Sequence, residues 1–217
     1  MTTRLDLSPD ELLATTRAVR KRLDFDRPVP RELVLECIAL AQQAPSGSNT
    51  QKWHFVVVSD AGLRGKIADI YRKAFALYEA SPMYAGAVRH DVEVLDAQQQ
   101  RVASSADYLA AHLHEAPHLV IPCIVGQIGT DSYVDRLRLG SIMPASWSFM
   151  LAARARGLGT CWTSLHLRFE EEVAELLGIP YPDVTQVLLT PLAFTKGTDF
   201  KSAVRPDPET ITHFDGW

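Results

Sequence analysis

The sequence predicts a single α+β domain spanning residues 1–217, and three observations support this prediction. The 217-residue chain is 47% hydrophobic and 22% charged, which is enough apolar material for one sizeable core. Helical patterns and short β-branched runs both occur, but they do not alternate as they would in a doubly wound parallel sheet. No internal repeat, low-complexity stretch or linker divides the chain.

The first two elements are predicted to be helices. Ser8-Pro9-Asp10-Glu11 combines an N-cap hydroxyl, a proline at the first helical position and a glutamate three residues after the cap. This pattern predicts a helix over about 9–21. Pro30 begins a second helix, in which apolar residues recur at helical spacing until Pro45 ends it.

A strand and a third helix follow. The polar loop 45–52 leads into 53–58, which is mostly apolar and β-branched and predicts a strand buried on both faces. Asp60 is a suitable N-cap for a helix that reaches about Tyr78. The segment 81–90 contains a proline and a glycine, and we expect it to be a loose flap.

The second half contains a long apolar helix between less distinctive elements. Residues 139–156 are apolar almost all round the helix, which fits a subunit interface and the core of one chain equally well. The other predicted elements are an exposed helix over about 91–115, a strand over 119–125, a helix near 169–177, a strand over 184–194 and an aperiodic tail over 195–217.

Charge and cysteine usage exclude several classes of protein. Lys and Arg number 22 against 26 Asp and Glu, so the net charge of −4 leaves no basic footprint for nucleic acid. No stretch approaches the roughly 20 apolar residues of a membrane span, and the first ten residues do not resemble a signal peptide. Cys37, Cys123 and Cys161 are odd in number and far apart, which favours a reducing compartment. We expect a cytoplasmic protein with no nucleic-acid or membrane partner.

Common catalytic motifs are absent. The sequence contains no G-x-S-x-G, no P-loop and no G-x-G-x-x-G. His112, His114 and His118 could suggest a metal site, but residues two apart face different sides of a helix and Pro117 interrupts the pattern. We therefore interpret them as surface histidines and expect no metal.

Two groups of polar residues could bind a ligand. Arg17 and Arg20 are three apart near the end of the first predicted helix, so they share a face and form either a phosphate clamp or an ordinary solvated surface. The loop 45–52 offers hydroxyls, amides and backbone N–H groups that suit the heteroatoms of a planar ring system. The alternative for this loop is a solvent-facing turn between a helix and a strand.

Three segments together resemble the FMN-dependent nitroreductase family. They are Arg17-Ala18-Val19-Arg20, the run from Ala44 to Trp53 (APSGSNTQKW) and Gly157-Leu158-Gly159-Thr160-Cys161-Trp162, in this order. The resemblance covers about Leu12 to Trp217. It implies a nitroreductase-like α+β fold with a central mixed sheet flanked by helices, and a homodimer with helices at its interface. It also implies FMN sites between the subunits and NADH or NADPH as reductant.

The resemblance also implies roles for particular residues. Within the first motif, Arg17 and Arg20, with Ala18 and Val19 between them, hold the FMN phosphate and ribityl chain. No side chain is implied as catalytic, because the chemistry takes place at the flavin N5. The tail 195–217 is expected to pack on the partner subunit. The other implied cofactor-binding residues are Lys201 and Arg205 in the tail, Ser46, Gly47, Ser48, Asn49 and Gln51 in the loop, Trp162, Thr163 and Ser164 facing the isoalloxazine, and Pro144 on the interface helix.

The implied activity is hydride transfer from NAD(P)H through FMN to a nitroaromatic, quinone or similar electron-poor acceptor, in a ping-pong cycle. Family alternatives are a reductive dehalogenase and a flavin-fragmenting oxygenase, and a further alternative is a catalytically idle flavin-binding protein. The sequence departs from the family pattern at several positions that bear on the pocket. Thr16 and Ala18 stand where Arg and Ser are usual, Lys52 where Pro is usual, and Trp147-Ser148 where Gln-Asn is often found.

Overall fold

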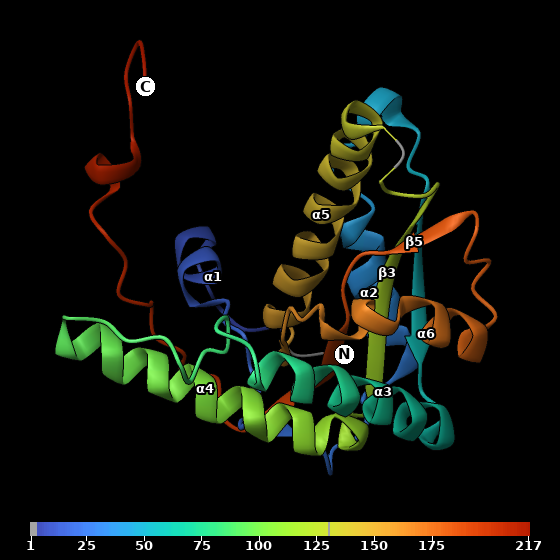
Figure 1. Cartoon of the computed structure of the whole chain (residues 1–217), viewed down its shortest axis with the longest axis horizontal. Helices are drawn as coiled ribbons and strands as arrows, with labels where there is room; N and C mark the ends of the chain where they lie inside the picture. The colour runs from blue at the N-terminus through green and yellow to red at the C-terminus, as the bar shows by residue number, and fades with distance from the viewer. Residues whose placement is uncertain (1–3, 130) are drawn as a thin grey trace.

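The computed structural model describes residues 4–129 and 131–217, which form a six-stranded sheet with helices on both faces (Figure 1). The central strand order is β1-β6-β3-β2, with β4 paired to β6 and β5 to β3. These ladders are antiparallel, while parallel bridges join Ala18 to Thr160 and Gly126 to Val184, so the sheet is mixed as predicted. The strands are β1 (Leu23–Asp24), β2 (Trp53–Val58), β3 (His118–Val125), β4 (Leu158–Thr160), β5 (Val184–Gln186) and β6 (Thr190–Thr195).

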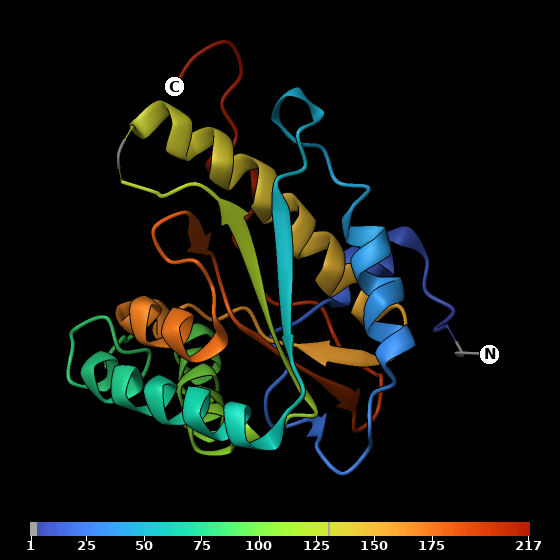
Figure 2. The same cartoon turned by 90° about the vertical axis from the view of Figure 1, so that its right-hand side faces the viewer.

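The helices cover the sheet in two groups. Figure 2 shows α2 and α5 on one side of the strands and α3, α4 and α6 on the other. This layered arrangement confirms the α+β class. The described helices are α1 (Pro9–Thr15), α2 (Arg31–Ala41), α3 (Ala61–Glu79), α4 (Glu93–His112), α5 (Ser132–Arg154) and α6 (Glu170–Leu177). None of them is long and apolar enough to cross a membrane.

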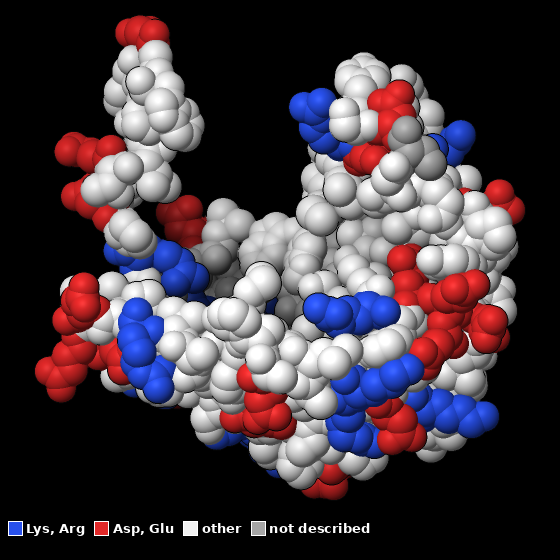
Figure 3. Space-filling model, in the orientation of Figure 1, with Lys and Arg blue, Asp and Glu red and all other residues white. Residues whose placement is uncertain are grey.

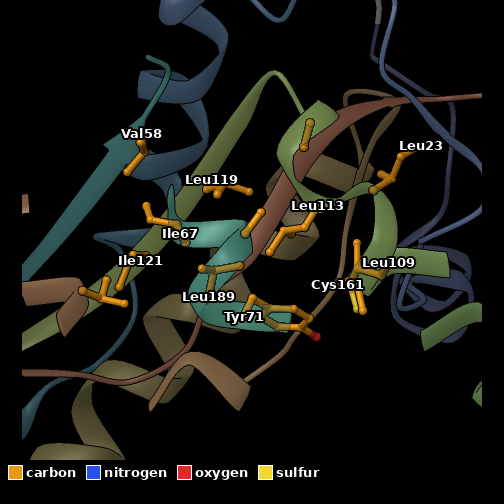
Figure 4. Close-up of a cluster of buried hydrophobic side chains, with 14 of the residues drawn as sticks. Leu23, Val58, Ile67, Tyr71, Leu109, Leu113, Leu119, Ile121, Cys161 and Leu189 are labelled. Carbon is orange, nitrogen blue, oxygen red and sulfur yellow. The ribbon is translucent and has the colours of Figure 1, made fainter. Parts of the chain in front are cut away.

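Successive side chains of the central strand β3 point to opposite faces of the sheet and enter two separate core clusters. Leu119 and Ile121 point into a cluster beneath α3 and α4, part of which is drawn in Figure 4. Val120 points to the opposite face, where it joins a cluster that includes Phe149 and Met150 of α5. Met150 is only 2% exposed, so this part of α5 belongs to the core of one chain.

The local signals for helix starts are confirmed. Glu11 N donates to Ser8 Oγ (3.2 Å) and Ser8 N donates to the Glu11 carboxylate (2.8 Å), which completes the predicted capping box. Asp60 caps α3 by accepting from Leu63 N at 2.8 Å. These signals need only neighbouring residues, which is why the sequence reveals them.

The first helix is shorter than predicted. It ends at Thr15, and the hydroxyls of Thr15 and Thr16 donate to the Glu11 and Leu12 carbonyls at 2.6 Å each. The chain then extends beside β4, where Val19 N donates to Thr160 O at 2.8 Å. Arg17 and Arg20 therefore do not share a helix face, and that prediction is wrong.

Three further predictions are corrected. Only Val58 of strand β2 is fully buried, because β2 lies at the edge of the sheet and lacks cover on one side. Helix α5 begins at Ser132, earlier than predicted, with Asp131 as its N-cap. The predicted strand 184–194 is divided into β5 and β6, because Leu189 between them pairs with Thr163.

One of the three histidines is not on the surface. His118 is 9% exposed, and its ring nitrogens bond to Ser59 Oγ (2.7 Å) and Val29 O (2.9 Å). It therefore ties two loops to the start of β3. The described residues contain no group of three or more potential metal ligands.

The C-terminal tail leaves the body of the molecule beyond β6 (Figure 1). Its apolar side chains are open to solvent in the single chain: Ile211 is 75% exposed, Phe214 88% and Trp217 105%.

Candidate functional site

Four arginines form two pairs on the first extended segment, the end of α5 and the tail. We refer to Arg17, Arg22, Arg154 and Arg205 together as the cationic cluster. Arg17 lies near Arg205, and Arg154 near Arg22; burial first, and then the neighbouring positive charge, lowers the pKa of Arg17 and of Arg154. Figure 3 shows positive side chains at the base of the tail, beside a hollow that separates the tail from the body. The cluster has the charge to hold a phosphate.

The cationic cluster contains little compensating negative charge. Among the described residues, only Asp199 forms an ion pair with any of its members, at 2.5 Å from Arg22. Arg22 also donates to Lys196 O at 2.9 Å and stacks over the Phe200 ring at 4.2 Å. Lys201 is exposed on the same tail segment and adds another positive charge. Such an excess of cations favours an anionic ligand.

Arg20 points to a different neighbourhood from Arg17. Its guanidinium donates to Ser105 Oγ of α4 at 3.0 Å and borders a cavity of ≈ 190 Å³. The cavity is rimmed by Trp162, Thr163 and Ser164, the predicted ring-facing residues, and its remaining wall is largely aromatic, with Tyr71, Phe75 and Tyr78. The structure thus brings Arg20 and the predicted ring-facing segment together. A cavity with these walls suits a planar ring system.

Tyr71 fixes the floor of this cavity. Its hydroxyl lies 2.8 Å from Thr163 Oγ1, and burial is the main cause that raises the pKa of Tyr71 to about 12. Cys161, next to Trp162, is 1% exposed, and burial raises its thiol pKa. Tyr71 and Cys161 therefore stay protonated at neutral pH. They shape the cavity and do not act as acid–base groups.

The polar loop has a strained backbone. Ser48, Asn49 and Gln51 have φ values of 52°, 53° and 43°, in the left-handed region that non-glycine residues seldom adopt. Gln51 N donates to Ser46 Oγ at 3.1 Å, and Gly47 N donates to Ser141 Oγ of α5 at 3.2 Å. These bonds hold the loop in one shape while the side chains of residues 47–51 remain exposed. The loop is thus a fixed and accessible set of polar groups.

The loop and Arg154 contact different parts of α5. The loop bonds to Ser141 near the middle of the helix, whereas Arg154, at its C-terminal end, donates to Thr15 Oγ1 at 3.1 Å. The two positions are thirteen apart along the helix, which is about 20 Å. A single chain therefore places the loop and the Arg154 end of the site well apart. Pro144 lies between the two contacts and is half-buried.

An apolar stripe runs along the exposed face of α5. Tyr133 is 66% exposed, Leu137 47%, Met143 37% and Trp147 39%, and their spacing places them on one side of the helix. Ser141 lies at the margin of this stripe, next to the loop. The exposed stripe is the part of α5 that is available to a second subunit.

Sequence reasoning missed three residues of this site. Arg154 and Ser141 lie inside a helix that reads as a core element, and Tyr71 lies inside α3. Each reaches the site only through contacts with residues distant in sequence: Thr15, Gly47 and Thr163 respectively. No local pattern distinguishes them from other helical residues.

Comparison with known proteins gives a consistent result. Residues 13–193 match the model of the nitroreductase family. A 5,6-dimethylbenzimidazole synthase from Rhodospirillum rubrum is 31% identical over 146 residues, which span 64% of this chain and 61% of that protein. A 4-nitrobenzoate reductase from Nocardioides sp. is 26% identical over 79% of this chain and 74% of its own length. The fold also resembles the FMN-dependent nitroreductase NfnB from Mycobacterium smegmatis in complex with NADPH, with a TM-score of 0.67, 21% identity, and coverage of 95% of this chain and 97% of that one.

Proposed function

Because this chain belongs to the nitroreductase family, we propose that it is an FMN-dependent oxidoreductase. It uses NADH or NADPH to reduce nitroaromatic, quinone or similar electron-poor acceptors in a ping-pong cycle. When bound, FMN supplies the chemistry, since it takes a hydride from the nicotinamide and delivers it to the acceptor. The relatives named 4-nitrobenzoate reductase and FMN-dependent nitroreductase support this reading.

One observation carries the proposal: a nearly uncompensated cationic cluster lies beside an aromatic-walled cavity. The two share the segment 16–20, with Arg17 turned to the cluster and Arg20 to the cavity. A phosphate monoester joined to a planar ring matches this pair of environments. A dinucleotide is less well matched, because the chain has no dinucleotide-binding fingerprint.

In one chain, some residues would then bind the phosphate of FMN and others would contact its ring. Arg17, Arg205 and Lys201 hold the phosphate through charge-assisted hydrogen bonds. Ala18 and Val19 fix the backbone between the two arginines by pairing with Thr160. Trp162, Thr163 and Ser164 contact the ring, and the positive charge of Arg20 favours negative charge on the ring's nearer edge.

The loop beside the middle of α5 would serve the site of a second copy. We propose a homodimer in which the exposed stripe of α5 is buried and Ser46, Gly47, Ser48, Asn49 and Gln51 reach the ring bound by the partner. Pro144 would approach the same site from the stripe. Tail residues 195–217 would pack on the partner, which would cover Ile211, Phe214 and Trp217. We also propose a reducing compartment, the cytoplasm, because all three cysteines are free thiols.

Anaerobic titration tests the proposal directly. The purified protein is reconstituted with FMN or FAD, and NADH or NADPH is added while visible flavin absorbance is followed. We expect FMN to bind and its absorbance to bleach, then to return when a nitroaromatic or quinone is added. Binding of FAD in preference to FMN, or no bleaching with either nicotinamide, would contradict the proposal. The second result would favour an idle flavin-binding protein.

A second candidate is a flavin-fragmenting oxygenase. The 31% identity to a 5,6-dimethylbenzimidazole synthase favours it, although the match spans less than two thirds of that protein. Reduced flavin exposed to oxygen without any other acceptor separates the two candidates. Loss of flavin and the appearance of a dimethylbenzimidazole would support the second. A panel of halophenols in the same assay covers the reductive dehalogenase alternative.

A further inference from the structure

Arg154 is a buried cation without a matching anion. It is the last residue of α5 and is 4% exposed. One terminal nitrogen, Nη2, donates to Thr15 Oγ1 (3.1 Å) and to Thr198 O (3.0 Å). The other two nitrogens, Nε and Nη1, are buried with no hydrogen-bond partner among the described residues. Leaving such donors unpaired is costly in a folded protein.

The nearby charge of Arg22 increases that cost. Both guanidinium groups also stack on Phe200, at 4.9 Å and 4.2 Å from the ring centre, and these cation–π contacts offset only part of it. Asp199, which follows Thr198 in the tail, is paired with Arg22. No carboxylate of the described residues forms an ion pair with Arg154, so no acidic side chain compensates its charge.

A second arginine at the same helix end shows the usual solution. Arg156 is 5% exposed, which closely matches Arg154, but its Nε donates to the Glu36 carboxylate at 3.0 Å and its Nη1 to Ala152 O at 3.1 Å. Arg156 is thus buried with a counter-charge, whereas Arg154 is buried to the same degree without one. An anionic ligand would supply the missing charge and accept the free N–H groups.

We propose that Arg154 is a phosphate-binding residue whose free N–H groups hold a phosphate monoester together with Arg17 and Arg205. This inference rests on the proposed function, in which the monoester is the terminal phosphate of FMN. Arg154 bonds to both segments that carry the other cations: Thr15, two residues before Arg17, and Thr198, in the tail that continues to Arg205. It would provide a guanidinium beside Thr16, where an arginine is usual in the motif.

Access to Arg154 requires the tail to move. Thr198 and Phe200 cover the guanidinium, and the tail beyond them is exposed. We therefore expect the phosphate to bind between the body and this part of the tail, with the tail held in place afterwards.

FMN and riboflavin differ only by the phosphate, so the ratio of their affinities reports the contribution of the phosphate to binding. Dissociation constants for both flavins are measured from flavin fluorescence for the wild type, Arg154→Met and Arg154→Lys. Methionine keeps an unbranched apolar stem against Phe200, and lysine keeps the charge but loses the planar fork. We expect Arg154→Met to weaken FMN binding by roughly ten- to a hundredfold and to change riboflavin binding by less than about twofold. Arg154→Lys should recover part of the FMN affinity.

Arg156→Met is the matched control, because it removes an equally buried arginine from the same helix end. It should leave the ratio of FMN to riboflavin affinity unchanged. Equal weakening of both flavins by Arg154→Met, or no change in FMN binding, would overturn the inference. If Arg154→Met does not fold, Arg154→Lys decides the question. We expect this variant to lower the ratio of FMN to riboflavin affinity several-fold.

A separate measurement distinguishes failure of this inference from failure of the proposed function. The melting temperature of the flavin-free protein is recorded in inorganic phosphate and in chloride of equal ionic strength. If the wild type binds neither flavin, the proposed function fails. A phosphate-dependent rise in melting temperature that is absent in Arg154→Met would still support the anion site. No such rise in a protein that binds neither flavin would overturn the site as well.

Discussion

Two parts of α5, its middle and its C-terminal end, present opposite chemistry. At the C-terminal end, Arg154 lies near Arg22 and forms no ion pair with an acidic residue among the described residues. In the middle, Ser141 supports a loop of mostly uncharged polar residues whose backbone is strained and whose side chains are exposed. The C-terminal end can hold a negatively charged group, and the loop can form hydrogen bonds to a neutral ring. About 20 Å of helix separates the two contacts, and we propose that they serve one ligand when they come from two chains.

The strongest test of this comparison is Trp147→Glu on the exposed stripe. A carboxylate buried in an apolar interface without a partner costs several kcal/mol. We expect the dimer dissociation constant to rise at least about a hundredfold, and FMN binding to fall with it. Sedimentation analysis with and without FMN measures both effects. Leu40→Glu, on an exposed position of α2, is the control and should leave the dimer intact. A Trp147→Glu protein that still dimerises would show that the stripe is not the interface.

Arg17→Ala and Arg20→Ala test whether Arg17 binds the FMN phosphate and Arg20 the flavin ring. Loss of a charge-assisted hydrogen bond costs about 1.5–3 kcal/mol, or roughly ten- to a hundredfold in affinity. We expect Arg17→Ala to weaken FMN but not riboflavin, because it faces Arg205, and Arg20→Ala to weaken both, because it lines the ring cavity. Equilibrium dialysis with each flavin measures this. Identical profiles for the two variants would remove the distinction between their roles.

The control for these two variants has to be chosen from the structure. Arg22 is close in sequence, but it bonds to Lys196 O and pairs with Asp199, so its loss would disturb the tail. Arg101, exposed on α4, is the better choice, and Arg101→Ala should bind both flavins as the wild type does.

Ser141→Ala tests the contact between α5 and the polar loop, and we expect a smaller effect on function from it. It removes the acceptor of Gly47 N and leaves the helix intact, at a cost of about 0.5–1.5 kcal/mol. We expect the KM for the electron acceptor to rise by about two- to tenfold while the FMN dissociation constant changes less. Ser146→Ala is matched, because among the described residues Ser146 Oγ bonds to Ile142 O alone, within the same helix. If both variants behave alike, the loop does not depend on Ser141.

Salt should weaken binding at the cationic cluster but not at the neutral loop, and this is the smallest effect that we expect. Raising potassium chloride from about 0.05 to 0.5 M screens the cationic cluster, so FMN binding should weaken by about threefold while riboflavin binding stays nearly constant. Fluorescence titration at each concentration measures this. A riboflavin affinity that falls equally would indicate that salt acts on the dimer rather than on the phosphate site.

The sequence alone determined the features that depend on neighbours along the chain. Ser8 and Asp60 cap their helices as predicted, and the α+β class follows from patterns that extend over a few turns. The motif residues Arg20 and Trp162–Ser164, far apart in sequence, meet at one cavity, in keeping with the family resemblance. A resemblance can convey such a contact because it carries the fold with it.

Only the tertiary structure decided the features that depend on distant partners. Thr160 draws residues 18 and 19 out of a helix, the edge position of β2 leaves that strand half-exposed, and Ser59 and Val29 bury His118. The same holds for Arg154, which reads as an ordinary helical arginine until Thr15 and Thr198 are seen beside it and its remaining donors are seen to be unpaired. Burial and charge compensation are properties of a three-dimensional neighbourhood, and no local pattern records them.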